Sequence, residues 1–240
     1  MRGLVIVPAF NEAANLPRVL SAIRLSNPTW DIVVVDDGSS DTSAQVAGKM
    51  GAVVLRSVLN LGIGGAVQTG FLWAREREYD LAVQIDGDGQ HDPQFIPALA
   101  APISQGELDL VIGSRFLEPG GFRSTMLRRL GIQYLSWFLR LRCGARVSDP
   151  TSGFRASGRR AIEFFAESYA TDYPEPESIA LAARSGLKVG EVPVRMRERF
   201  TGRSSINAWR TLYYLTKVSL ALILLPPGSG ELMLNREDSP

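Results

Sequence analysis

Residues 81–93 read LAVQIDGDGQHDP. The first six of these residues form a mostly apolar run of the length that buried strands have. Asp86, which ends this run, and Asp88 each have a glycine after them, and Asp92 and Pro93 then supply a helix cap and a favoured first helical residue. The stretch therefore predicts a buried strand that passes through a polar turn into a helix.

The same succession recurs throughout residues 1–115, where short β-rich runs alternate with segments of helical spacing. Strands are expected at residues 4–8, 32–36, 52–55, 81–86 and 108–113, and helices at residues 13–25, 42–50, 65–78 and 93–105. The short connections predict an α/β fold, a mainly parallel sheet with helices on both faces. Ligands of such sheets bind beyond the carboxyl ends of the strands.

After residue 115 this alternation stops. Helices are expected at residues 125–144, 159–168, 177–184 and 208–225, a strand at residues 188–194, and a turn-rich motif at residues 149–155. Residues 228–240 are polar, and we expect them to form a disordered tail. The pattern predicts one domain over residues 1–227, with a second part that begins at residue 116.

Composition narrows the class of protein. The 240 residues are 45% hydrophobic, and their mean hydropathy of +0.02 excludes both a disordered chain and a multi-span membrane protein. The single cysteine and single histidine exclude a disulfide framework and any site built from several such residues. The net charge of +1 conceals a division, because residues 1–122 carry 8 basic and 14 acidic side chains (−6) and residues 123–240 carry 18 and 11 (+7).

The turn after the strand at residues 81–86 is the strongest chemical signal. Asp86, Asp88 and Gln90 offer two carboxylates and an amide oxygen at alternate positions, and oxygen ligands suit a hard cation such as Mg²⁺. Glycines between them allow the tight turn that lets the side chains converge. The same pattern is equally typical of a solvated Asp-Gly turn that binds no ligand.

A second acidic pair, Asp36 and Asp37, ends another expected strand. A carboxylate there is placed to bind a ribose hydroxyl or a base edge, whereas a purely structural entry to the next helix is the alternative. We expect one of the two aspartates to be structural. The glycine-rich residues 60–65 lack the last glycine of a dinucleotide fingerprint, since Val67 occupies that position, and no P-loop motif is present.

Six motifs in order resemble the family-2 glycosyltransferases of the GT-A fold, most closely the branch of dolichyl-phosphate mannose synthases and bacterial polyprenyl-phosphate glycosyltransferases. They are VPAFNEAANL, VVVDDGSSDTS, NLGIGGAVQTGF, QIDGDGQHDP, DLVIGSRF and DPTSGFRA. The resemblance spans about residues 3–206. It implies an inverting, metal-dependent hexosyltransferase with a nucleotide-sugar-binding part at residues 1–115 and an acceptor and membrane-interface part at residues 116–227.

The resemblance also implies roles for individual residues. Asp86, Asp88 and Gln90 would hold Mg²⁺ or Mn²⁺ against the donor diphosphate, with Asp88 also counted as catalytic. Arg115 would approach the phosphates or the acceptor, and the basic segment that includes Arg199 and Arg203 would close over the diphosphate. The donor, of the GDP-mannose or UDP-glucose type, would be lined by Pro8, Phe10, Asn11, Glu12, Asp37, Gly62 and Asp86.

The acceptor is less defined. A polyprenyl or dolichyl phosphate needs little help from a base, whereas a hydroxyl of a polysaccharide or glycolipid, as in rhamnosyl transfer from dTDP-rhamnose, requires a carboxylate. The candidate carboxylates for such a base are Asp149, Asp172, Glu175 and Glu177. A non-catalytic nucleotide-binding partner protein is the alternative outside the enzymes, and the intact acidic turn argues against it.

Residues 123–146 contain six arginines and no acidic side chain. Composition alone favours an ordinary packing helix, but the resemblance implies a helix at the membrane interface. Its interface residues would be Arg128, Arg129, Trp137, Phe138 and Arg140. The apolar residues 212–225 are too few to span a bilayer. We expect a peripheral protein on the cytoplasmic face of the membrane, with no nucleic-acid partner. A homodimer or a membrane-protein partner stays open.

Overall fold

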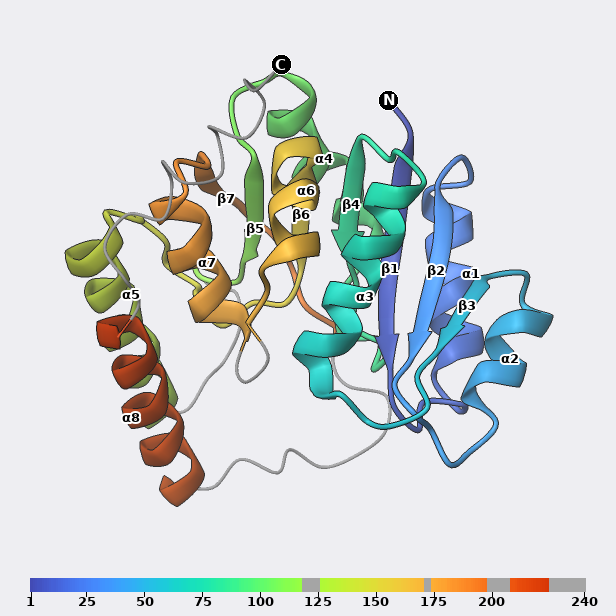
Figure 1. Ribbon diagram of the computed structural model, residues 1–240, viewed down its shortest axis with the longest axis horizontal. Coiled ribbons are helices and arrows are strands. Elements are labelled where there is room, and N and C mark those ends of the chain that lie inside the picture. Colours follow the sequence, from blue (N-terminus) through green and yellow to red (C-terminus); the bar gives the residue numbers. More distant parts are fainter. Residues whose placement is uncertain (118–125, 171–173, 198–207, 225–240) are drawn as a thin grey trace, which may run out of the picture.

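The computed structural model describes residues 1–117, 126–170, 174–197 and 208–224, and side chains from residue 129 in the second range and residue 215 in the last. Its strands form a seven-stranded sheet in the order β3-β2-β1-β4-β6-β5-β7 (Figure 1). The strands are β1 Gly3–Ala9, β2 Asp31–Asp36, β3 Val53–Arg56, β4 Leu81–Gln84, β5 Leu110–Ser114, β6 Arg155–Gly158 and β7 Val189–Pro193.

Helices connect the strands and cover the sheet. They are α1 Leu16–Ser26, α2 Ser43–Lys49, α3 Gly62–Glu76, the 3₁₀ turn η1 Pro93–Phe95, α4 Ile96–Ser104, α5 Met126–Cys143, α6 Arg159–Glu167, α7 Pro174–Arg184 and α8 Ala208–Leu224. The expected parallel sheet is confirmed for β3, β2, β1 and β4, and for the pair of β5 and β7.

Every residue of β1 is buried, and alternate side chains enter two different cores. Val5 and Val7 pack with α1 and α4, whereas Leu4 and Ile6 pack with α3 and α6. Helix α3 lies so close to β1 that a Cβ at Gly70 would come within 2.3 Å of the Ile6 side chain. Burial on both faces explains why the sequences of these strands are continuously apolar and do not alternate between apolar and polar residues.

Strand β6 was not expected, because the sequence around it predicts only a turn-rich motif. It lies antiparallel between β4 and β5. All four of its residues are buried, although they read Arg-Ala-Ser-Gly. Arg155 is accommodated because its guanidinium donates to the carbonyls of Pro150, Ser152 and Glu175 and to the Ser178 hydroxyl. The sheet is therefore mixed rather than wholly parallel.

Helices α5, α7 and α8 form a third core beside β5 and β7. Leu135 and Leu139 of α5 pack there with Ile179, Val218 and Leu222. In Figure 1, α5 and α8 lie side by side at the end of the molecule that is remote from β3. Among the described residues, no helix has the length and apolar character needed to cross a bilayer. The expected tail at residues 228–240 lies outside the described residues.

Candidate active site

The carboxyl ends of β1 and β2 are joined by hydrogen bonds between the loops that follow them. The Asn11 N–H donates to Ser39 Oγ at 2.9 Å, and the Ser40 N–H donates to Asn11 Oδ1 at 2.9 Å. The Glu12 N–H donates to Ser43 Oγ at 2.8 Å. Asn11 adopts a positive φ of 56°, which asparagine tolerates better than most residues. The loop proposed to line the nucleotide pocket is thus held in one conformation.

Both aspartates at the end of β2 have protein partners. The two carboxylate oxygens of Asp37 accept from the Leu61 N–H at 2.7 Å and the Gly62 N–H at 2.8 Å, so this side chain fixes the start of α3. Asp36 is fully buried, and its Oδ2 lies 3.3 Å from Arg56 Nε. One structural aspartate was expected, but both hold the fold. A donor contact of Asp37 stays a prediction.

The turn after β4 brings Asp86 and Asp88 to the same edge of the sheet. Gly89 has a φ of +79°, and the Gln90 N–H closes the turn by donating to Asp88 Oδ1 at 3.0 Å. Asp86 Oδ1 accepts from Gln84 Nε2 at 3.1 Å. The Asp86 side chain is 36% exposed, whereas Asp88 is buried.

His91, to which the sequence assigned no role, supports Asp86. Its Nδ1 accepts the Asp86 N–H at 3.0 Å, so the ring proton is on Nε2, which lies 3.7 Å from Asp86 Oδ2. The buried ring stacks on Phe154 with centroids 4.9 Å apart. Its place directly after the acidic turn is the signal by which it could have been found.

The residues at this turn fit a hard divalent cation. Asp86 and Asp88 would supply carboxylate oxygens, and a Cβ at Gly153 would lie only 3.2 Å from Asp86 Oδ2, so glycine preserves the space in front of that carboxylate. No group of three or more His, Cys, Asp or Glu side chains suited to a metal occurs within the described ranges. Gln90, water and substrate oxygens are further candidate ligands.

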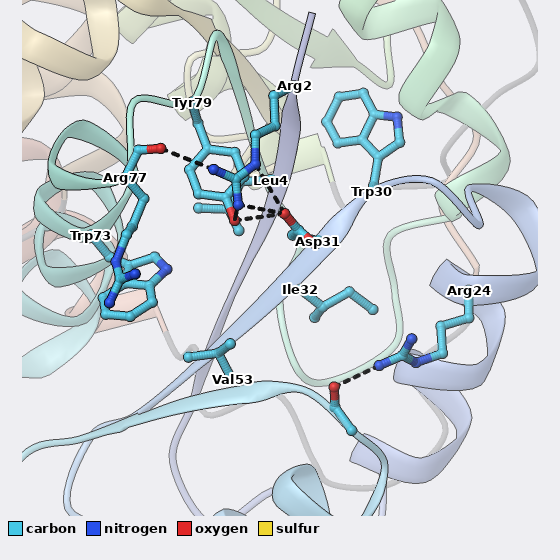
Figure 2. A pocket seen from close by; sticks show the side chains of 11 residues that line it. Arg2, Leu4, Arg24, Trp30, Asp31, Ile32, Val53, Trp73, Arg77 and Tyr79 are labelled. Atoms are coloured by element: carbon cyan, nitrogen blue, oxygen red, sulfur yellow. Dashed lines mark hydrogen bonds and ion pairs between the residues drawn. The ribbon is translucent and has the colours of Figure 1, made fainter.

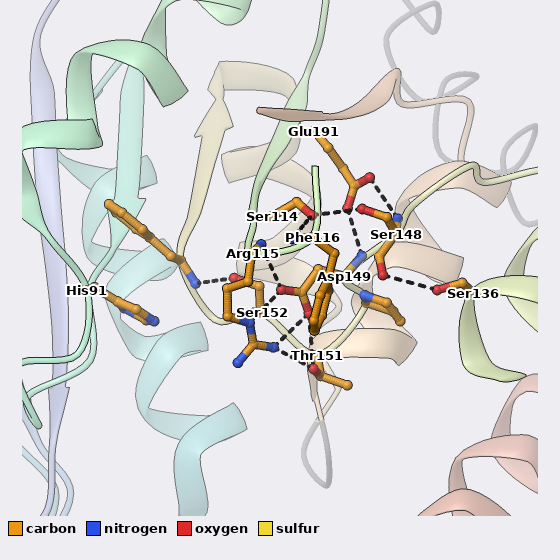
Figure 3. A network of polar contacts seen from close by, with 12 residues as sticks. His91, Ser114, Arg115, Phe116, Ser136, Ser148, Asp149, Thr151, Ser152 and Glu191 are labelled. Atoms are coloured by element: carbon orange, nitrogen blue, oxygen red, sulfur yellow. Dashed lines mark hydrogen bonds and ion pairs between the residues drawn. The ribbon is translucent and has the colours of Figure 1, made fainter. Parts of the chain in front are cut away.

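Arg115 and Asp149 form a buried ion pair beyond β5 (Figure 3). Arg115 Nε donates to Asp149 Oδ2 at 2.6 Å and Nη2 to Oδ1 at 2.7 Å, while Nη2 also reaches Thr151 Oγ1 at 2.8 Å. Both Asp149 oxygens are therefore engaged, which disfavours its use as a base. Its predicted base role, and the predicted contact of Arg115 with phosphate, remain untested.

Glu191 of β7 holds the loop that carries Asp149, a role that the sequence analysis did not predict. Its carboxylate accepts the Ser148 N–H at 2.7 Å and the Asp149 N–H at 2.9 Å. Ser148 Oγ in turn lies 2.7 Å from Ser114 Oγ at the end of β5. Figure 3 shows these groups as one chain of contacts from β7 to Arg115.

Residues 4–165 match the family model described as glycosyl transferase family 2, which is more than half of the chain. The chain belongs to glycosyl transferase family 2. The resemblance seen in the six motifs is thereby confirmed, and with it the assignment of this protein as a glycosyltransferase.

Relatives of this family 2 glycosyltransferase cover most of its length. The undecaprenyl-phosphate mannosyltransferase of Micrococcus luteus is 35% identical over 217 residues, 86% of this chain and 88% of the relative. The polyprenol monophosphomannose synthase of Mycolicibacterium smegmatis is 32% identical over 216 residues, 86% and 81% of the two chains.

A solved structure confirms the GT-A fold. Glucosyl-3-phosphoglycerate synthase from Mycobacterium tuberculosis, in complex with Mn²⁺, uridine diphosphate and glucosyl-3-phosphoglycerate, superposes with a TM-score of 0.70. The match covers 93% of this chain and 78% of that one at 23% identity. At this identity the likeness concerns the fold alone.

The remaining site predictions for this glycosyltransferase fall in three places. Glu175 and Glu177 lie in the first turn of α7, where burial raises the pKa of Glu175 and nearby Arg155 opposes that rise. Pro8 and Phe10 lie at the end of β1, with Phe10 49% exposed. Asp172, Arg199 and Arg203 lie outside the described residues.

The predicted interface residues lie on α5 of the glycosyltransferase. Arg129 and Arg140 are exposed, Trp137 is 59% exposed, and Phe138 is half-buried against the third core. The side chain of Arg128 is outside the described set. The helix thus packs with one side and leaves the other exposed, and its location at a membrane interface stays a prediction.

A separate cavity lies near the amino ends of β1, β2 and β3 (Figure 2). Polar groups in it contact one another, because Arg2 binds Asp31 at 3.0 Å and the Tyr79 hydroxyl donates to Asp31 at 2.7 Å. Burial, together with the bond to Asp31, raises the pKa of Tyr79 to about 12. Ligands of such sheets bind at the carboxyl ends of the strands. The candidate active site of the glycosyltransferase therefore lies at that end of the strands and not at this cavity.

Proposed function

We propose that this glycosyltransferase transfers a sugar from a nucleotide-sugar to a polyprenyl or dolichyl phosphate, with a divalent cation, at the cytoplasmic face of a membrane. Relatives of more than 30% identity are named for polyprenyl-phosphate, undecaprenyl-phosphate and dolichyl-phosphate acceptors, which supports this acceptor class. Their printed names include both mannose and N-acetylglucosamine transfer, so the donor sugar stays open between GDP- and UDP-linked sugars.

The observation that carries the proposal is the acidic turn at the carboxyl end of β4. Asp86 and Asp88 stand there with space kept by Gly153, beside the loops that follow β1 and β2. A cation at this turn would stabilise the negative charge that develops on the departing nucleotide. Asp86 and Asp88 would bind it, and the loop of Asn11 and Glu12 would position the donor.

Chemistry at the acceptor favours a phosphate. A phosphate oxygen is anionic near neutral pH and can displace the nucleotide without losing a proton first, whereas a hydroxyl needs a base within hydrogen-bond reach. Asp149 is committed to Arg115 by two hydrogen bonds. Asp149 is therefore poorly placed to accept a proton from a hydroxyl acceptor.

The exposed side of α5 and α8 supports a membrane location. Leu130, Tyr134, Trp137 and Leu141 follow one another at helical spacing and are between 38% and 64% exposed. On α8, Leu220, Ile223 and Leu224 are between 52% and 70% exposed. The helices contact each other, since Arg142 Nη2 donates to the Ile223 carbonyl at 3.2 Å. An apolar face edged by arginines suits an anionic lipid surface.

Glu175 supports a second candidate, transfer to a hydroxyl of a glycan. The pKa of this carboxyl is raised mainly by burial, and the charges of Asp86 and Arg115 also act on it. A carboxylate with a raised pKa is better matched to base catalysis at neutral pH. The two candidates make opposite predictions for a substitution of Glu175, which is taken up in the Discussion.

A transfer assay tests the proposal. The protein is incubated with Mn²⁺, radiolabelled GDP-mannose, UDP-glucose, UDP-N-acetylglucosamine or dTDP-rhamnose, and vesicles that contain undecaprenyl phosphate. We expect a labelled lipid that mild acid hydrolyses, and no such lipid from an Asp88→Asn control. Absence of the lipid with every donor overturns the proposed acceptor.

A further inference from the structure

The segment that follows β7 runs across the carboxyl ends of the neighbouring strands toward the acidic turn. In this crossing segment, residues 194–197, the Val194 N–H donates to the Ser114 carbonyl at 3.0 Å. Met196 then pairs with His91 in an isolated antiparallel bridge, and the Arg197 N–H donates to the Gln90 carbonyl at 2.8 Å. A strand at the edge of the sheet is thus connected to the end of β4, although β5 and β6 lie between them.

The side chain of Arg197 adds a second connection to the same turn. Its Nη2 lies 2.7 Å from Asp92 Oδ1, with side chains that are 37% and 16% exposed. Asp92 also accepts the Gln94 N–H at 3.1 Å and so caps η1. Arg197 therefore contacts the turn through its backbone at Gln90 and through its guanidinium at Asp92.

These contacts hold the C-terminal end of the turn that carries the proposed cation ligands. Gln90 ends the run of Asp86, Asp88 and Gln90, and Asp92 stands two residues later. Loss of a group that orients ligands without touching the cation typically lowers metal affinity about 10- to 100-fold. A partly exposed ion pair contributes little to global stability, so its loss should act mainly on local geometry.

We propose that Arg197 is a positioning residue, which fixes the turn at residues 86–92 in its cation-binding conformation through Asp92. The inference rests on the proposed cation-dependent function. Arg197 touches neither donor nor cation in this account, and its effect passes through Gln90 and Asp92.

The test measures cation binding directly. Free Mn²⁺ is followed by its electron paramagnetic resonance signal during titration of the protein in the presence of UDP and, in parallel, of GDP, and the nucleotide that supports binding is used for the variants. We expect Arg197→Gln and Asp92→Asn each to weaken Mn²⁺ binding about tenfold. The double variant should be no weaker than either single one, because both remove the same interaction. Arg197→Lys should recover part of the loss.

Arg160→Gln provides a matched control. Arg160 pairs with Asp109 at 3.1 Å, with side chains 52% and 14% exposed, beside the amino end of β5. Its removal should leave Mn²⁺ binding unchanged. In the transfer assay, Arg197→Gln should raise the half-saturating Mn²⁺ concentration about tenfold and keep kcat at saturating Mn²⁺ within about twofold of the unsubstituted protein.

The results distinguish a failure of the positioning role of Arg197 from a failure of the proposed cation-dependent function on which it rests. If the unsubstituted protein binds no Mn²⁺ with either UDP or GDP present, the proposed cation-dependent function is overturned, and this inference with it. If it binds Mn²⁺ and Arg197→Gln binds equally well, only the positioning role is overturned. An equal loss in Arg160→Gln, or additive losses in the double variant, would also contradict that role.

Discussion

The imidazole Nδ1 of His91 accepts the backbone N–H of Asp86 at 3.0 Å, so the residue that follows the acidic turn holds the residue that begins it. The ring is kept in place by its stacking on Phe154. A short loop that is bonded across its own ends in this way has few conformations to choose from before a ligand arrives. The turn is therefore organised by the protein itself.

Replacing His91 by phenylalanine should keep the stacked ring but leave the Asp86 N–H without its acceptor. We expect a loss of about 1–3 kcal/mol in the free energy of unfolding, which is the cost of an unsatisfied buried N–H. Urea denaturation followed by circular dichroism measures it. A variant as stable as the parent would mean that the hydrogen bond contributes nothing, and Phe154→Leu reports separately on the stacking.

The contributions of Arg115 and Asp149 to the free energy of unfolding should be coupled. Arg115→Met or Asp149→Asn alone leaves a buried group without its partner, and we expect each to lower the free energy of unfolding by about 3–5 kcal/mol. The combination of Arg115→Met with Asp149→Asn should lose less than the sum of the two single losses. Strictly additive losses in denaturant titrations would show that the pair is not coupled.

Glu175→Gln should distinguish a phosphate acceptor from a hydroxyl acceptor. A phosphate acceptor needs no base, so kcat should change less than about threefold, whereas loss of a general base costs on the order of 10²–10⁴ in rate. Initial rates with each acceptor at neutral pH decide between these outcomes. A large loss with the lipid phosphate would assign Glu175 a part in the reaction that the present proposal does not give it.

The exposed side of α5 should bind lipid. Trp137→Ser with Leu141→Ser removes two side chains that are 59% and 64% exposed, and we expect vesicle binding to weaken about 100-fold, or about 2.7 kcal/mol. Sedimentation with vesicles that contain anionic lipid measures the change. Leu25→Ser is the control, since Leu25 is 85% exposed on α1. Equal binding by all three proteins would contradict the membrane face.

Tyr79 should make stability fall at high pH. Its pKa is raised to about 12, from about 10 in an unfolded chain, so the folded state keeps a proton that the unfolded state releases. The stability linked to this proton is complete below about pH 10 and is lost as the pH rises toward 12. Tyr79→Phe should flatten that decline in urea titrations between pH 9 and 12. A parallel decline in both proteins would show that other groups cause it, of which Tyr169 is the first to test, because burial also raises its pKa to about 12.

The sequence predicted the first four strands because each is apolar and each is followed by a polar turn. It did not predict β6, because Arg155 is stabilised there by carbonyl groups at residues 150, 152 and 175, and such partners leave no periodic pattern. It located the acidic turn but assigned no role to His91 or Glu191. Both act by accepting backbone N–H groups, a function that residue type and spacing do not reveal.

The position of β6 has a consequence for the order of folding. Leu81 of β4 pairs with Gly158 of β6, and β6 also pairs with β5, so neighbours in the sheet are far apart in the chain. Until residues 155–158 have left the ribosome, β4 and β5 lack the strand that lies between them and present unpaired edges, which invite association with other chains. The β4 and β5 sides of the candidate active site would then be assembled late in synthesis, and slowly, because contacts between distant residues form slowly. Mutations in β6 should therefore lower the yield of folded enzyme even where the finished protein tolerates them.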